Sequence, residues 1–119
     1  MLDGLSDYYS DTGQERVGLI LSDGRAIEVE NLHDDPYNGF DVSTDLLIEY
    51  ENLIVGTFHT HPGKDSNLSA EDFQAFTNWP HADHYIIGSD GIRRYQVRDG
   101  QVFNAGKTNL TRCAEDPVS

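Results

Sequence analysis

The chain has 119 residues, a length that fits one domain with a modest hydrophobic core. Its formal net charge is −13, from 21 acidic and 8 basic residues, so nucleic acid and anionic membrane surfaces are not expected as partners, because both would be repelled. The 37% of hydrophobic and 24% of charged residues indicate a globular protein, and no apolar run approaches the roughly 20 residues of a membrane helix.

The compartment is inferred from two further features. Cys113 is the single cysteine, so an internal disulfide is excluded and nothing argues for an oxidising compartment. Residues 1–10 have neither the basic start nor the apolar stretch of a secretory signal. We therefore expect a cytoplasmic protein. Its acidic surface is explained by solubility, and it also permits attraction of metal cations and basic substrates.

The first half of the chain predicts a short opening helix, a hairpin and a second helix. In chain order we expect a helix at 2–9, strands at 16–21 and 25–30, a loop at 31–40 and a helix at 41–51. The pair Asp23-Gly24 between the two strands is typical of a tight hairpin turn. Ser43 is the expected N-cap of the second helix.

The second half predicts a central strand, a helix and a meander. In chain order we expect a strand at 53–58, a loop at 63–68, a helix at 69–77 and strands at 84–88, 92–98 and 101–104. The continuous apolar run of the first strand is typical of burial on both faces, and aspartate–glycine pairs predict the later hairpin turns. Residues 107–119 show little periodicity and are expected as a flexible tail, which leaves 1–106 as the domain.

These elements together predict a mixed sheet, partly a meander, with two or three helices packed against it. Such a pattern belongs to the α/β class in the loose sense. The chain has no glycine-rich phosphate loop and no dinucleotide-binding fingerprint, so a nucleotide cofactor is not expected.

The chemically informative segment joins two histidines at a strand end to an aspartate at a helix start. His59 and His61 are two residues apart, so both imidazoles lie on one side of the strand. Pro62 ends the strand because it has no N–H to donate. Asp72 lies in the first turn of the next helix and reaches the imidazoles if that helix returns over the strand end. These side chains suit Zn²⁺ and would leave a fourth position for water, as in catalytic zinc sites.

Two further residues would complete a hydrolytic site. Water on zinc has a pKa of about 7 and still needs a carboxylate to take its proton. Glu15, just before the first strand, is the best candidate, with Asp7 and Asp11 as nearby alternatives. The hydroxyl of Ser69, one helical turn from Asp72, is placed to donate a hydrogen bond to a developing oxyanion.

At these residues the chain resembles the JAMM (MPN+) metallopeptidases. Their signature is His-x-His-Pro, six residues, then Ser-x-x-Asp, with a separate upstream glutamate. The matching positions are His59, His61, Pro62, Ser69 and Asp72. The stretch from Glu15 to Ile20 is similar to the family's Glu-x-x-Gly element, and the likeness continues to about Phe103.

The resemblance implies a helix-flanked MPN/JAMM (cytidine-deaminase-like) fold and a zinc-dependent metallopeptidase or isopeptidase. It implies Zn²⁺ ligands His59, His61 and Asp72. It implies Glu15 as general acid/base and Ser69 as the group that stabilises the tetrahedral intermediate. The substrate would be a protein or peptide, such as a ubiquitin-like tail, a phage tail protein or a cell-wall peptide.

A narrower likeness gives a second interpretation. Residues 31–43 resemble the corresponding stretch of the JAMM domain in phage tail-tip assembly proteins. On this interpretation the chain is an assembly or interaction protein of a virion or host cytoplasm, and its metal site is structural or vestigial.

Several of these residues also have ordinary structural interpretations. Ser69-x-x-Asp72 is close to a capping box, and Glu15 taken alone is a surface acid. His33 is a candidate for the wall of a substrate groove. The remaining expectations are structural or exposed positions for His81 and His84, and core or helix-end packing for Phe73, Phe76 and Trp79.

Overall fold

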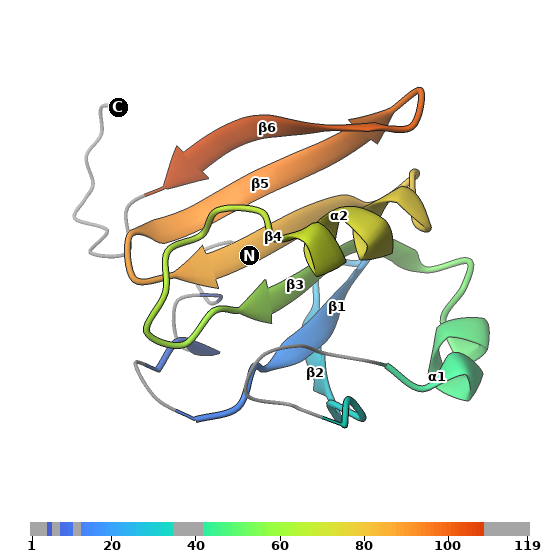
Figure 1. Cartoon of the computed structure of the whole chain (residues 1–119). Helices are drawn as coiled ribbons and strands as arrows, with labels where there is room; N and C mark the ends of the chain where they lie inside the picture. Colours follow the sequence, from blue (N-terminus) through green and yellow to red (C-terminus); the bar gives the residue numbers. More distant parts are fainter. Residues whose placement is uncertain (1–4, 6–7, 11–12, 35–41, 109–119) are drawn as a thin grey trace.

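The computed structural model describes residues 5, 8–10, 13–34 and 42–108, and they form one twisted sheet with two short helices (Figure 1). The elements are β1 (Val17–Leu21), β2 (Ala26–Val29), α1 (Thr44–Glu49), β3 (Ile54–Thr60), α2 (Ala70–Thr77), β4 (Asp83–Gly88), β5 (Gly91–Arg98) and β6 (Gln101–Thr108).

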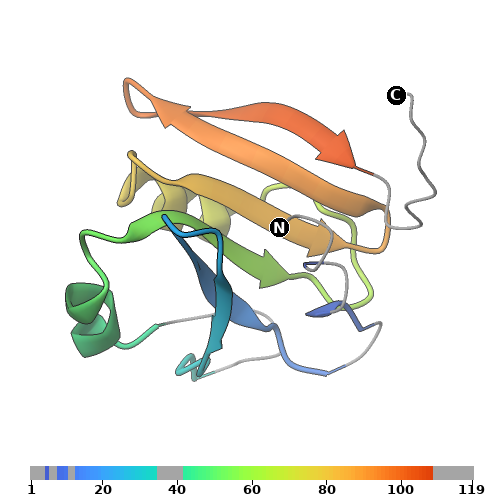
Figure 2. The same ribbon diagram turned by 180° about the vertical axis from the view of Figure 1, so that it is seen from behind.

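The strand order is β2-β1-β3-β4-β5-β6, which puts β3 in the interior of the sheet (Figure 2). Only the β3–β4 pair is parallel among these neighbours, and α2 lies in the connection between its two strands. In the two ladders of β3, His59 lies opposite Val17 of β1 and opposite Ile86 of β4. The C-terminal end of β3 is therefore supported from both sides.

The sheet buries a different cluster on each face. One cluster consists of Leu5, Ile20, Phe58, Tyr85, Ile87 and Ile92, with Tyr8 and Tyr9 packed against it. The other consists of Phe76, Ile86, Tyr95 and Val97, so α2 covers this second face through Phe76. Since side chains alternate along a strand, Phe58 faces the first cluster and His59 faces α2.

The predicted α/β class with two or three flanking helices is wrong. Among the described residues the sheet dominates, and the two helices have only 6 and 8 residues. The helix expected at 41–51 is confined to Thr44–Glu49, and its Ile48 is 62% exposed. Leu5, Tyr8 and Tyr9, which come from the segment expected as the opening helix, pack on the face of the sheet opposite α2. The prediction of a helix-flanked MPN/JAMM fold is wrong for the same reason.

All six predicted strands are confirmed, with altered ends. Both strands of the first hairpin, the interior strand and all three strands of the meander are present. The last strand runs to Thr108, two residues past the predicted domain end. Phe73, expected to be packed, is 44% exposed, whereas Phe76 is buried. Most of the opening helix predicted at 2–9, and residues 109–119 with Cys113, lie outside the described residues. Neither helix is long and apolar enough to span a membrane.

Candidate metal centre

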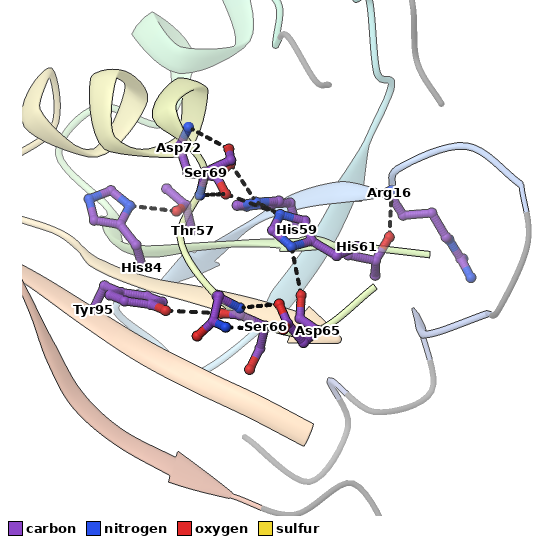
Figure 3. A network of polar contacts seen from close by, with 12 residues as sticks. Arg16, Thr57, His59, His61, Asp65, Ser66, Ser69, Asp72, His84 and Tyr95 are labelled. Carbon is purple, nitrogen blue, oxygen red and sulfur yellow. Dashed lines mark hydrogen bonds and ion pairs between the residues drawn. The ribbon is translucent and has the colours of Figure 1, made fainter. Parts of the chain in front are cut away.

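Two buried histidines meet where β3 ends. His59 is the penultimate residue of β3, and His61 continues along β4 by donating its backbone N–H to the carbonyl of Ile87 at 2.9 Å. The two residues are 1% and 6% exposed. Their Nε2 atoms lie 3.2 Å apart, because residues two apart on an extended chain project to the same side (Figure 3).

The first turn of α2 brings Asp72 to the same point. Its Oδ1 atom lies 2.9 Å from Nε2 of His59, and its Oδ2 atom lies 3.0 Å from Nε2 of His61. Asp72 is 2% exposed. The structure thus brings together the three residues expected as ligands, and it does so through the predicted return of the helix over the strand end (Figure 3).

Glu15 joins the group from the other neighbouring strand. The β1–β3 register, continued two residues beyond the pair Val17–His59, puts Glu15 opposite His61. Glu15 is 5% exposed, and ligand atoms of Glu15, His59 and His61 all lie within 4.8 Å of one another. The side chain of Asn31 donates to the Glu15 carbonyl at 2.8 Å and steadies this part of the backbone. The alternatives Asp7 and Asp11 lie outside the described residues.

Ser69 is the N-cap of α2. Its hydroxyl accepts from the backbone N–H of Asp72 at 3.1 Å, and its own N–H donates to Oδ2 of Asp72 at 3.0 Å. This is the capping box that the structural interpretation of Ser69-x-x-Asp72 describes. A hydroxyl that accepts one hydrogen bond still has a proton to donate. The Ser69 hydroxyl can therefore cap the helix and also donate a hydrogen bond to an oxyanion.

Burial and mutual contacts set the charges of the centre. Burial raises the pKa of the Asp72 carboxyl, but the hydrogen bonds from His59 and His61 outweigh it and hold that pKa far below its ordinary value. Burial lowers the pKa of His59. Burial also acts to lower the pKa of His61, but the Asp72 carboxylate together with the carbonyl of Asp65 and the charge of Glu15 gives a net increase.

The spacing of these groups fits a zinc ion. Ligand atoms about 2.0–2.1 Å from zinc at tetrahedral angles lie about 3.3 Å apart. The contact of 3.2 Å between Nε2 of His59 and Nε2 of His61 is close to that separation, and each imidazole lies 2.9 or 3.0 Å from a different carboxylate oxygen of Asp72. Nδ1 of His61 donates to the carbonyl of Asp65 at 2.9 Å, so the neutral ring presents the lone pair of Nε2 to the centre.

A cavity of about 190 Å³ lies on the same face of the sheet. Its lining is mostly apolar and consists of Val17, Gly18, Leu19, Val42, Leu47, Ile54, Thr57, Ala75, Phe76, Asn78, Trp79 and His84. It shares two residues with the surroundings of the centre. Val17 lies opposite His59 in the ladder, and the ring of Phe76 lies 6.0 Å from that of His59. The cavity could therefore accept an apolar group of a ligand bound at the centre.

The other histidines lie outside this group. His84 is 1% exposed and structural, whereas His81 is exposed. His33 donates its backbone N–H to the side chain of Asn31, which places it near the segment that carries Glu15. Sequence reasoning missed Asp65, which acts through its backbone carbonyl. Since every residue carries a carbonyl, no pattern of side-chain types signals this role.

Comparisons with known proteins inform the fold alone. No family model and no curated protein sequence matches the chain. Among solved structures, it is similar to the solution structure of protein DSY2949 from Desulfitobacterium hafniense, with a TM-score of 0.64 and 21% sequence identity over 86% of this chain and 83% of that chain. The architecture described above is thus shared with another protein, and the chemistry of the site must be argued from its own residues.

Proposed function

We propose that the protein is a zinc-dependent hydrolase that cleaves an amide bond in a protein or peptide. One observation carries the proposal: Nε2 of His59, Nε2 of His61 and the carboxylate of Asp72 contact one another at 3.2 Å or less inside the protein. The motif spacing that resembles the JAMM metallopeptidases supports a hydrolytic centre of this kind.

His59, His61 and Asp72 would hold the metal. A zinc ion with three protein ligands lowers the pKa of a bound water to about 7 and polarises a carbonyl oxygen. The low pKa of Asp72 keeps it a carboxylate at neutral pH, and the low pKa of His59 keeps that ring neutral, which is the form that binds a metal.

Glu15 would act as general base and then general acid. Its carboxylate lies in the group whose ligand atoms are within 4.8 Å of one another, so it can take a proton from an attacking water and return it to the leaving amine. The hydroxyl of Ser69, fixed by the helix cap, would donate to the substrate oxygen as negative charge develops there.

The surroundings of the centre favour a particular kind of peptide. The adjacent cavity is lined mostly by apolar side chains, which supports a substrate with an apolar residue next to the scissile bond. The net charge of −13 supports a neutral or basic peptide over an acidic one, because an acidic peptide would be repelled.

The test combines metal analysis with a library of peptides that vary the residues around the amide. We expect one zinc per chain, and activity that chelation removes and zinc restores. Glu15→Gln should keep the zinc and lower turnover by about 10²–10⁴-fold, the usual contribution of a general acid/base. Glu30→Gln, at an exposed position just beyond β2, is the matched control and should leave turnover unchanged.

Two results would contradict this assignment. Full activity of Glu15→Gln would remove Glu15 from the mechanism, and loss of zinc from this variant would make Glu15 a ligand. Zinc bound by the wild type without turnover of any library member would favour the structural metal site of an assembly protein.

A further inference from the structure

The segment that follows the two histidines crosses the end of the β4–β5 hairpin. Residues 63–68 were expected as a loop, and Ser66 in its middle is completely buried. A buried serine in a loop is unusual, because its backbone and hydroxyl groups must all find partners away from water.

All three polar groups of Ser66 have partners on the hairpin. Its N–H donates to Oδ1 of Asp90 at 2.8 Å, its carbonyl accepts from the hydroxyl of Tyr95 at 2.9 Å, and its Oγ accepts from Nε of Arg93 at 3.2 Å. Arg93 and Asp90 also form an ion pair at 3.4 Å. We call Ser66 with Asp90, Arg93 and Tyr95 the Ser66 anchor (Figure 3 shows Ser66 and Tyr95).

The backbone on either side of the anchor is held as closely. The N–H of Lys64 donates to the carbonyl of His61 at 3.0 Å, and the N–H of Ser89 donates to the carbonyl of Lys64 at 2.7 Å. A Cβ atom at Gly88 would collide with the backbone of Asp65 and Ser66. Residues 63–68 therefore pack against the β4–β5 hairpin through several hydrogen bonds, which argues against a movable lid over the centre.

The carbonyl of Asp65 lies between the anchor and the metal ligands. It accepts a hydrogen bond from Nδ1 of His61 at 2.9 Å. A carbonyl can only accept, so this contact keeps the proton of the neutral ring on Nδ1 and turns Nε2 toward His59 and Asp72.

We propose that the Ser66 anchor is a positioning device for His61. It acts by fixing the Asp65 carbonyl, which selects the tautomer and the orientation of the ring that binds zinc. The inference rests on the proposed function in that zinc is the ion bound. Partners of this kind, one step removed from the metal, affect metal affinity by about 10–100-fold in other proteins.

Tyr95→Phe tests the anchor, because it removes the hydrogen bond to Ser66 and keeps a ring packed against Phe76, 5.8 Å away. We expect about 10-fold or weaker zinc binding in competition with a chelator, and a changed visible spectrum of the Co²⁺-substituted protein. In the metal-free protein, at a pH high enough to make the His61 ring neutral, ¹⁵N NMR should show that the Nδ1–H tautomer of His61 loses its dominance.

Tyr85→Phe is the matched control. Tyr85 is a buried tyrosine of the opposite face, and its hydroxyl bonds to Arg94 rather than to the segment. This variant should leave zinc affinity and the His61 spectrum unchanged. Asp90→Ala provides a second variant of the anchor at a partly exposed position, because it removes the acceptor of the Ser66 N–H. The proposal therefore stays testable if Tyr95→Phe does not fold.

The two proposals fail in different ways. A wild type without stoichiometric zinc would refute the proposed function, and the NMR spectrum of His61 would then decide the positioning role alone. Wild-type zinc affinity with an unchanged His61 tautomer in both anchor variants would overturn the positioning role and leave the proposed function standing.

Discussion

His84 lies close to the candidate metal centre, and its hydrogen bonds engage both ring nitrogens. Its Nε2 donates to the carbonyl of Trp79 at 2.9 Å, and its Nδ1 accepts from the hydroxyl of Thr57 at 2.7 Å. Its ring stacks on Phe76 with centroids 4.2 Å apart. Both nitrogens are thus used to tie the C-terminal end of α2 to β3 and β4.

This environment predicts a loss of stability in acid. Burial lowers the pKa of His84 to about 4 from 6.5. As the pH falls below about 6.5, His84 therefore becomes protonated in the unfolded chain but stays neutral in the folded chain. The contribution of His84 to the free energy of unfolding should fall by about 2 kcal/mol between about pH 7 and pH 5.

Urea unfolding of the metal-free protein at both pH values measures this effect. His84→Gln should be less stable at neutral pH and should lack about 2 kcal/mol of the wild-type decrease on acidification. His81→Gln, at an exposed histidine, should retain the whole decrease. An equal pH dependence of wild type and His84→Gln would show that other groups cause it.

At the residue scale, the sequence predicted the groups whose roles follow from spacing. His59 and His61 share a side because strand periodicity is two, and Asp72 is aimed back by the capping box that Ser69 begins. The partners of Asp65 and Ser66 could not be predicted in this way. They depend on where the β4–β5 hairpin lies in space, which no local pattern specifies.

Gly18 shows a constraint between elements of the sheet. It lies in β1 opposite Phe58 of β3 and Glu28 of β2. A Cβ atom at this position would collide with the Phe58 ring and with the carbonyl of Ile27. The absence of a side chain thus lets the Phe58 ring lie over β1 within the first core cluster.

Gly18→Ala is therefore expected to destabilise the protein by about 1–3 kcal/mol, the usual cost of overpacking a core. Phe58→Leu should reduce this cost, because it removes the ring atoms that the new methyl group meets, while the clash with the Ile27 carbonyl stays. Urea unfolding of the two single variants and the double variant gives the coupling. Additive effects would contradict a direct contact between positions 18 and 58.

At the element scale, the strands and their turns were predictable because turn chemistry is local. Gly24 has a φ of +93° and Gly100 a φ of +77°, the left-handed backbone conformations that the turns predicted from aspartate–glycine pairs require. The length of α1 was not predictable from its local sequence. A helix keeps its length mainly through packing, and in α1 Leu46 and Leu47 are only half-buried while Ile48 is exposed.

At the scale of the whole molecule, the sequence predicted a mixed sheet and gave the wrong class. The sheet has two buried faces, and α2 covers only one of them. On the other face, Leu5, Tyr8 and Tyr9 pack against the sheet, and their spacing in the sequence shows little of the periodicity of a helix or a strand. The share of helix was overestimated because the helix predicted at 41–51 forms only over Thr44–Glu49, although the residues of the metal centre come from the segments at the start of β1, the end of β3 and the start of α2.

The centre joins these three elements, so zinc should stabilise the whole molecule. An ion that binds only the folded chain raises the free energy of unfolding by about 2.7 kcal/mol when its free concentration is 100 times the dissociation constant. We therefore expect zinc to raise the melting temperature of the chelator-treated wild type, with a shift that grows with zinc concentration.

The two aspartates in the first turns of the helices provide the comparison. Asp72 of α2 touches both histidines, whereas Asp45 occupies the equivalent turn of α1 and is exposed. Asp72→Asn should greatly reduce the zinc-dependent shift in melting temperature, and Asp45→Asn should retain it in full. If zinc moved the melting curves of both variants equally, the ion would be stabilising the acidic surface in general, and the meeting of β1, β3 and α2 would not be its binding site.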